Sequence, residues 1–176
     1  MTLARFFRRL FGGLFMAALE PGAKAPEFSW KALDGKSYQL KEALAGGPLL
    51  VAFFKISCPT CQYTLPFLER FGKHFGRVWG VSQDDARGTK DFAKDYGISF
   101  PLLLEDTQEY PTSNAYGLTH VPSVFLVGKG GEILHSMVGF GKKDLEDVAA
   151  KMTELTGKQG FAPFQAGEDV ASFKSG

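Results

Sequence analysis

The sequence contains few cysteines, little net charge and no long apolar run, and each of these absences excludes a class of protein. Only two of its 176 residues are cysteines, so it has no disulfide framework, and cysteine usage leaves the compartment open. A net charge of +1, without a basic cluster interleaved with aromatics, argues against nucleic acid as a partner. No apolar run has the length of a transmembrane span. A hydrophobic content of 44% instead predicts one globular domain with a sizeable core.

The two cysteines lie together, as Cys58-Pro59-Thr60-Cys61, directly after the apolar run 49–54. That run is short and rich in aromatics and predicts a buried strand, whereas residues 62–75 carry apolar side chains at helical spacing. At a strand-to-helix junction, unpaired backbone N–H groups and the positive end of the helix dipole favour a thiolate at Cys58 over a thiol. A Cys-x-x-Cys pair in this position predicts a redox site.

Two structural roles fit the cysteine pair less well. A closed zinc site needs four ligands, but the chain has no second Cys-x-x-Cys, and His74, His120 and His135 are widely scattered. A structural disulfide across so small a loop would remove little chain entropy from the unfolded state. We therefore expect neither a metal nor another cofactor at this site.

Residues 1–20 predict a basic amphipathic helix that stands apart from the domain. Apolar residues from Leu3 to Leu19 recur at helical spacing, three arginines lie off that stripe, and Pro21-Gly22 ends it. Such a helix could lie on a membrane surface, act as an export segment or dock on the domain or a twin subunit. We favour docking or membrane-surface contact over export, and the bacterial cytoplasm over the periplasm, because Gly12-Gly13 interrupts the apolar stretch and no small-x-small cleavage site follows.

Along the rest of the chain, strands alternate with helices. We expect strands at 28–32, 37–40, 48–54, 78–82, 101–104, 122–127 and 132–138, and helices at 41–45, 62–75, 89–96, 110–116 and 142–155. Turn residues at Asp34-Gly35 and between the last two strands indicate β-hairpins. This order predicts an α/β domain over residues 21–157, with a mixed central sheet and helices on both faces. Residues 158–176 are expected to form a tail that wraps loosely or is mobile.

Several motifs in this order are typical of one family. They are the opening 21–28, the turn 33–36, the stretch 53–61, Pro66, the segments 92–97 and 100–103, and the loop 117–123. From Pro21 to Thr156, the chain resembles the thioredoxin superfamily, and within it the TlpA/ResA-like thiol-disulfide oxidoreductases of the AhpC/TSA (peroxiredoxin-like) group. The resemblance implies a thioredoxin-like fold with an N-terminal β-hairpin and an inserted βα unit.

The resemblance also implies roles for individual residues. Cys58 would be the exposed attacking thiol and Cys61 the buried resolving thiol. The Val121-Pro122 bond would be cis and lie across the site, where Val121 pairs with an extended substrate strand. Pro59 and Thr60 would complete the substrate-binding surface. The implied partners are protein disulfides or dithiols and a redox donor.

The sequence departs from the family pattern near the thiols. Ala52 stands where many thioredoxins carry a buried acid, so the proton acceptor for Cys61 must come from elsewhere. Glu105, Asp106 and a water molecule are the candidates.

Two basic side chains are further candidates for tuning the site. Lys55, three residues before Cys58, could stabilise the thiolate or be a solvated lysine. His120, beside the predicted cis-proline, could donate a proton or be a loop histidine without a role, and we favour the second interpretation.

Three functions compete. In dithiol–disulfide exchange, which we favour in the reducing direction, Cys58 attacks a substrate disulfide and Cys61 releases the reduced product. In a peroxiredoxin-like peroxidase, Cys58 would be peroxidatic and Cys61 would resolve its sulfenic acid. Peroxiredoxins, however, carry threonine and proline at the positions of Lys55 and Val51. A copper-binding protein would use both sulfurs with His120, but related copper carriers have a longer cysteine spacing.

Overall fold

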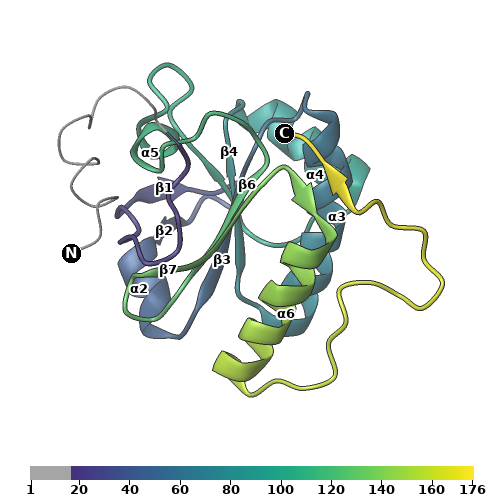
Figure 1. Ribbon diagram of the computed structural model, residues 1–176. Helices are drawn as coiled ribbons and strands as arrows, with labels where there is room; N and C mark the ends of the chain where they lie inside the picture. Colours follow the sequence, from purple (N-terminus) through teal and green to yellow (C-terminus); the bar gives the residue numbers. More distant parts are fainter. Residues whose placement is uncertain (1–16) are drawn as a thin grey trace.

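The computed structural model describes residues 17–176, so the helix predicted at residues 1–20 lies almost wholly outside the described residues. A five-stranded sheet forms the centre of the domain (Figure 1). From edge to edge its strands are β5 (Leu102–Leu104), β4 (Val78–Ser82), β3 (Leu49–Phe54), β6 (Ser123–Val127) and β7 (Ile133–Val138). β3, β4 and β5 are parallel, whereas β6 pairs antiparallel with both β3 and β7. The predicted mixed sheet is confirmed.

β3 is the central strand because its sequence is apolar at every position. All six residues of Leu49–Phe54 are buried, as expected for a strand covered on both faces. Successive side chains of a strand point to opposite faces, so Ala52 and Phe54 join one hydrophobic core while Val51 and Phe53 join the other. β3 therefore leads the chain through the middle of the molecule to the cysteine pair.

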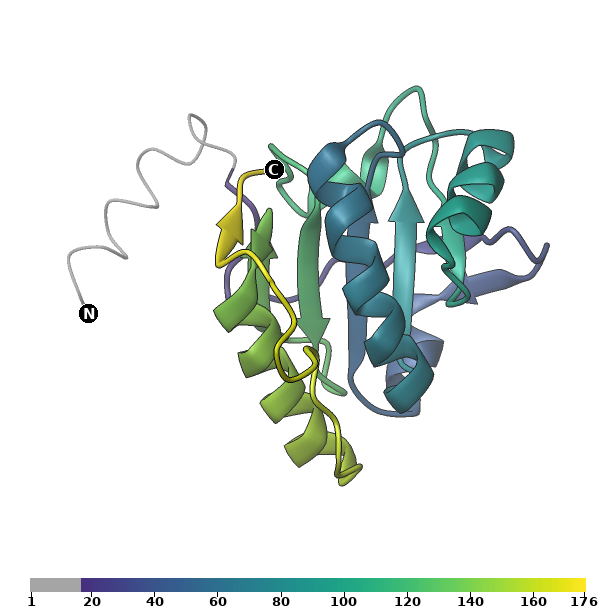
Figure 2. The same cartoon turned by 90° about the vertical axis from the view of Figure 1, so that its right-hand side faces the viewer.

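Helices cover both faces of the sheet, as predicted. One face carries α3 (Pro59–Phe75), α4 (Ala86–Tyr96) and α6 (Lys142–Thr156) (Figures 1 and 2). The other carries α2 (Leu40–Ala45), α5 (Pro111–Ala115) and the predicted hairpin of β1 (Ser29–Lys31) and β2 (Ser37–Gln39) (Figure 1). Within residues 17–176, no helix is both long enough and apolar enough to cross a bilayer.

Two helices begin earlier than their apolar spacing predicts, because capping groups fix their first turns. α3 begins at Pro59 instead of Gln62, with Cys58 as its N-cap. α4 likewise begins early, at Ala86, since the Asp85 carboxylate accepts a hydrogen bond from the first turn at 2.7 Å. The first cysteine is therefore part of a helix cap, and the second lies inside the helix.

Residues 158–176 form a return segment that runs back along α3 (Figure 2). Phe161 packs on Phe71 near the end of the helix, with ring centroids 4.6 Å apart. Phe164 packs on Phe67, one turn earlier, at 5.2 Å. The segment ends in β9 (Phe173–Lys174), which pairs antiparallel with β8 (Phe140–Gly141).

An ion pair holds the return segment at its midpoint. The Arg70 guanidinium donates two hydrogen bonds to the Glu168 carboxylate, at 2.8 and 2.7 Å, and one to the Pro163 carbonyl at 2.8 Å. The tail is therefore packed along α3 in this structure, and the expectation that it is mobile stays a prediction. Its aromatic residues have no helical or strand periodicity, so their packing partners could not be predicted.

Candidate active site

Cys58 stands at the junction of β3 and α3 and caps the helix with its sulfur. Its backbone is extended (φ −83°, ψ 116°), and its Sγ accepts a hydrogen bond from the Cys61 N–H at 3.1 Å. Pro59 follows at the start of the helix, where an N–H would have no intrahelical acceptor. The Cys58 side chain is partly exposed. Its sulfur is thus accessible and lies at the positive end of the helix dipole.

Cys61 lies in the first turn of α3 and has no exposed surface. Burial, followed by hydrogen bonding with the Cys58 sulfur, raises the pKa of the Cys61 thiol. The charge of Asp84 adds to this rise, whereas a hydrogen bond with the Lys55 backbone opposes it. No disulfide joins the two cysteines in this structure, and the site combines an accessible sulfur with a buried thiol whose pKa is raised.

The predicted partner loop lies beside Cys58. The Val121-Pro122 peptide bond is cis, as predicted, and the Cys58 thiol donates a hydrogen bond to the Val121 carbonyl at 3.3 Å. The Ser123 hydroxyl closes the loop by donating to the His120 carbonyl at 2.7 Å. Within residues 17–176, no acceptor is found for the Val121 N–H. An open backbone donor therefore lies next to the accessible sulfur.

A hollow of about 240 Å³ adjoins this loop and brings the two basic candidates together. Lys55, His120 and Val121 contribute to its lining. The Lys55 ammonium lies over the Tyr110 ring, 5.5 Å from the centroid, and the exposed His120 Nδ1 is 3.0 Å from the Thr119 hydroxyl. Both side chains border the site, and their effect on the thiols stays a prediction.

The Glu105 side chain makes its hydrogen bonds with Ser113. Its buried carboxylate accepts hydrogen bonds from the Ser113 N–H at 2.7 Å and from the Ser113 hydroxyl at 2.5 Å. The same hydroxyl accepts from the Gln83 amide at 2.7 Å. These contacts join the end of β4 to α5 and give Glu105 a structural role. Its proposed role as proton acceptor for Cys61 has no support in them.

Asp84 is the acidic residue that sequence analysis missed. Its carboxylate accepts a hydrogen bond from the Ile56 N–H at 2.8 Å, two residues before Cys58, and its charge acts on Cys61. The signal was available: Asp84 follows β4 as Cys58 follows β3, and the two strands are parallel neighbours. Parallel strands bring the residues after their carboxyl ends to one edge of the sheet.

Thr60 lies in the first turn of α3, and another part of the chain engages its side chain, so its role in substrate binding stays a prediction. The Thr60 hydroxyl donates a hydrogen bond to the Ser175 carbonyl of the return segment at 2.6 Å. The last residues of the sequence thus lie close to the proposed substrate-binding surface, at the end of the molecule where α3 begins (Figures 1 and 2).

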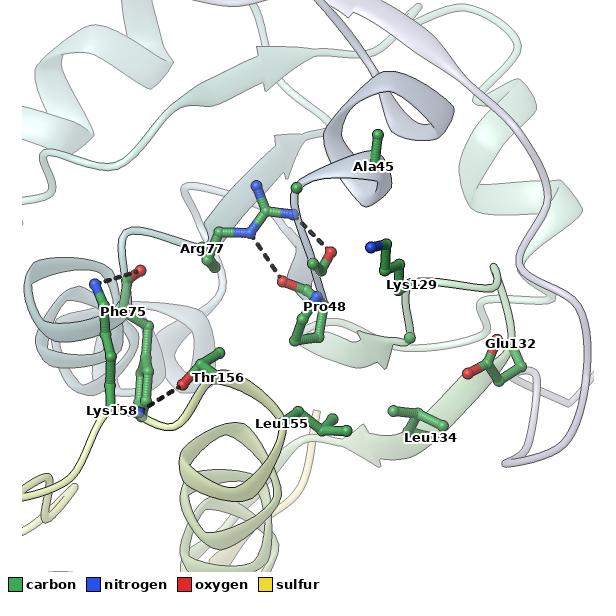
Figure 3. A pocket seen from close by; sticks show the side chains of 13 residues that line it. Ala45, Pro48, Phe75, Arg77, Lys129, Glu132, Leu134, Leu155, Thr156 and Lys158 are labelled. Carbon is green, nitrogen blue, oxygen red and sulfur yellow. Dashed lines mark hydrogen bonds between the residues drawn. The ribbon is translucent and has the colours of Figure 1, made fainter.

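A larger hollow, of about 670 Å³, lies at the other end of the sheet, near the start of β3 and the end of α3 (Figure 3). The Arg77 guanidinium beside it donates to the carbonyls of Pro48 at 3.0 Å and Gly47 at 2.7 Å. The Lys158 ammonium donates to the Phe75 carbonyl at 3.4 Å. Both cations donate hydrogen bonds to backbone carbonyls, in the loop before β3 and at the end of α3. The charged side chains at this hollow therefore have a structural role, far from the cysteines.

Among residues 17–176, no group of three or more histidine, cysteine or acidic side chains is placed to hold a metal ion. The expectation that the site works without a metal or another cofactor stays a prediction.

The order of elements and the cysteine pair match known proteins. The sequence profile of the AhpC/TSA family matches residues 21–136. The chain belongs to the AhpC/TSA family. A thiol-disulfide oxidoreductase ResA of Bacillus anthracis is 28% identical over 152 residues, which cover 82% of this chain and 86% of that protein. A thioredoxin-like protein YneN of Bacillus subtilis is 25% identical over 136 residues, or 73% of this chain and 78% of YneN.

Solved structures share the fold of this AhpC/TSA protein. The thioredoxin domain of a thiol-disulfide oxidoreductase from Bacteroides vulgatus superposes with a TM-score of 0.66 at 24% identity, covering 76% of this chain and 98% of that domain. Peroxidoxin BcpB from Mycobacterium tuberculosis superposes with a TM-score of 0.64 at 19% identity, covering 77% of this chain and 97% of that chain. The resemblance and the thioredoxin-like fold inferred from the sequence are confirmed.

Proposed function

We propose that this AhpC/TSA protein is a thiol-disulfide oxidoreductase that exchanges the Cys58–Cys61 dithiol with disulfides of protein substrates. One observation carries the proposal: an accessible Cys58 sulfur, capped by the Cys61 amide at 3.1 Å, is paired with a fully buried second thiol. The ResA relatives, which are named thiol-disulfide oxidoreductases, support the same chemistry.

The reaction proceeds by two exchanges of sulfur. The Cys58 thiolate attacks one sulfur of the substrate disulfide, forms a mixed disulfide and expels the other sulfur as a thiolate, which takes up a proton. Cys61 then loses its proton and attacks the Cys58 sulfur, which expels the second substrate sulfur. Two electrons pass from the dithiol to the substrate. The protein is left with a Cys58–Cys61 disulfide, which a redox donor must reduce.

In this scheme, the raised pKa of the buried Cys61 thiol delays its reaction until Cys58 has attacked the substrate. Because burial raises its pKa, Cys61 stays protonated while Cys58 attacks, so the two sulfurs do not compete for the substrate. The open Val121 N–H beside Cys58 is suited to pair with an extended substrate strand.

Single-cysteine variants test the proposal with insulin as the protein disulfide. The wild-type protein should reduce insulin, and Cys58→Ser should lower the rate by about a hundredfold or more, because the attacking group is lost. Cys61→Ser should instead accumulate a mixed disulfide between Cys58 and an insulin chain, seen by mass spectrometry under non-reducing conditions. Wild-type rates for Cys58→Ser would reject the proposal.

Mixing the reduced protein with hydrogen peroxide separates exchange from peroxidase chemistry. We expect slow oxidation of Cys58, similar to that of an ordinary thiol. Rapid formation of a sulfenic acid at Cys58, faster than the reaction with insulin, would favour the peroxidase instead.

A further inference from the structure

The end of the return segment forms a strand next to the proposed active site. Phe173 and Lys174 pair antiparallel with Gly141 and Phe140, and the Lys142 N–H donates to the Ser172 carbonyl at 3.0 Å. An added strand of this kind is how extended peptides bind to protein edges. β8 therefore presents a short edge to which an extended chain can bind.

The same segment ends between Thr60 and the cis-proline loop. The Ser175 carbonyl accepts a hydrogen bond from the Thr60 hydroxyl at 2.6 Å. Gly176 lies so close to the loop that an added Cβ would be 2.8 Å from the Val121 carbonyl oxygen. That oxygen is also the acceptor for the Cys58 thiol. Residues 175–176 thus lie where a substrate strand beside the Cys58 sulfur would lie.

Tyr63 and Gly139 help to hold the segment in this position. The Lys174 ammonium lies over the Tyr63 ring at 4.7 Å, and the Tyr63 hydroxyl accepts from the Ala171 N–H at 3.1 Å. Gly139 has a left-handed backbone (φ 77°), and a Cβ there would overlap the Lys174 carbonyl oxygen. The close approach of the segment to β8 therefore requires a glycine at position 139.

We propose that residues 172–176 are an internal ligand of a groove that binds extended polypeptides, and that protein substrates reach Cys58 by displacing them. The groove is formed by Thr60, the β8 edge and Val121. This inference rests on the proposed function and adds the regulation of that site: a protein substrate reaches Cys58 only when residues 172–176 leave it.

Residues 172–176 are held weakly, as expected for an internal ligand that a substrate displaces. β9 contains only two residues, and Phe173 is 63% exposed, so little apolar surface holds it. The firm anchor is farther back, where Arg70 binds Glu168. Segments with few buried contacts open locally at low free-energy cost, and a substrate strand would replace the same backbone hydrogen bonds.

Two variants remove the internal ligand in different ways. One is a deletion of residues 172–176, and the other is Gly139→Ala in the full chain, which forces a methyl group against Lys174. Gly157→Ala is the matched control, since Gly157 has a similar backbone (φ 72°) and nothing within 4 Å of an added Cβ. Circular dichroism checks that all three proteins are folded.

Alkylation of Cys58 and steady-state reduction of insulin are measured on each protein. The deletion and Gly139→Ala should raise the alkylation rate and lower KM for insulin by about fivefold with kcat unchanged, because apparent affinity scales with the open fraction. Gly157→Ala should behave as wild type. A synthetic peptide of residues 171–176 should restore the higher KM in the deletion variant, and a scrambled peptide should not.

The outcomes distinguish this inference from the proposed function. Unchanged alkylation and KM in both variants would overturn the inference, as would a loss of insulin reduction confined to them, since the segment would then belong to the substrate-binding surface. Failure of every protein, wild type included, to reduce insulin would overturn the proposed function. Faster alkylation in the two variants would still support the internal ligand in that case.

Discussion

Cys58 and Cys61 are separated by only two residues, yet the helix that begins between them gives their sulfurs different surroundings. Cys58 remains outside the first turn, where solvent and a helix N–H both reach its sulfur. Cys61 is inside the turn and in the core, where its side chain has no exposed surface and burial disfavours a thiolate. The start of α3 therefore gives the proposed attacking sulfur and the proposed resolving sulfur different surroundings.

The two thiols should differ in reactivity when each is studied alone. At neutral pH, Cys61 in a Cys58→Ser variant should react with iodoacetamide about a hundredfold more slowly than Cys58 in a Cys61→Ser variant, because the thiolate is the nucleophile. Burial raises the pKa of Cys61, so its rate should still increase at alkaline pH where an ordinary thiol has levelled off. Timed mass spectrometry measures both rates. Equal rates would contradict the assignment.

Asp84 should influence Cys61 through its charge. In the Cys58→Ser background, Asp84→Asn should lower the pKa of Cys61, because a nearby negative charge disfavours the thiolate. The alkylation profile should move to lower pH by less than about one unit, since burial is the larger cause. Asp85→Asn is the control, because asparagine also caps helices. A shift to higher pH would mean that Asp84 assists proton removal instead.

The residues that could be predicted from the sequence are those that belong to local motifs. Cys58 and Cys61 were placed by the strand-to-helix junction that they mark, and Val121-Pro122 by the resemblance of its loop to that of the thioredoxin superfamily. Asp84 was missed, because its contact with Ile56 joins residues 28 positions apart. Only the pairing of β3 with β4 brings them together, and one sequence does not state which strands pair.

At the level of elements, the predictions were accurate wherever apolar side chains recur with a period. β3, α3 and α6 lie close to their predicted ranges, because buried faces dictate those periods. The return segment has no such period. Its aromatic residues, Phe161 and Phe164, pack on rings of α3 that are far away in the sequence, so its path could not be derived from its own sequence.

The ion pair between Arg70 and Glu168 should control how firmly the return segment is held. Glu168→Gln removes the charge but keeps a similar shape, and should increase limited proteolysis within residues 158–176 by roughly fivefold at most, because such partly exposed pairs contribute modestly. The melting temperature should change little. Glu154→Gln, on the exposed side of α6, is the control and should leave cleavage unchanged. Equal cleavage of both variants would contradict this role.

Low pH should also loosen the return segment, because it protonates Glu168. Hydrogen bonds from Arg70, the largest cause, lower the pKa of Glu168 from 4.5 to about 2. A carboxylate with a lowered pKa stabilises the folded form above its ordinary value, and this stabilisation is lost as the pH falls toward 2. Hydrogen exchange of residues 161–171 should therefore accelerate in that window in the wild type, and less so in Glu168→Gln.

At the scale of the whole molecule, the central sheet separates the core that contains Cys61 from a second core on its other face. The core that contains Cys61 lies on the face covered by α3, α4 and α6. The opposite core contains Phe53, Tyr116 and Phe125, whose rings lie 5.0 to 5.9 Å from one another. Neighbouring residues of β3 thus support different halves of the protein, and substitutions there can distinguish stability from site geometry.

Phe53→Ala and Phe54→Ala should each lower the free energy of unfolding by about 3–5 kcal/mol, because both remove a fully buried ring. Urea denaturation measures this loss. Only Phe54→Ala should change the environment of Cys61, since Phe54 belongs to the same core. In the Cys58→Ser background it should accelerate alkylation of Cys61 several-fold under conditions where both variants are folded, whereas Phe53→Ala should not. Equal acceleration by the two substitutions would show that overall stability, rather than the core beside the site, protects the buried thiol.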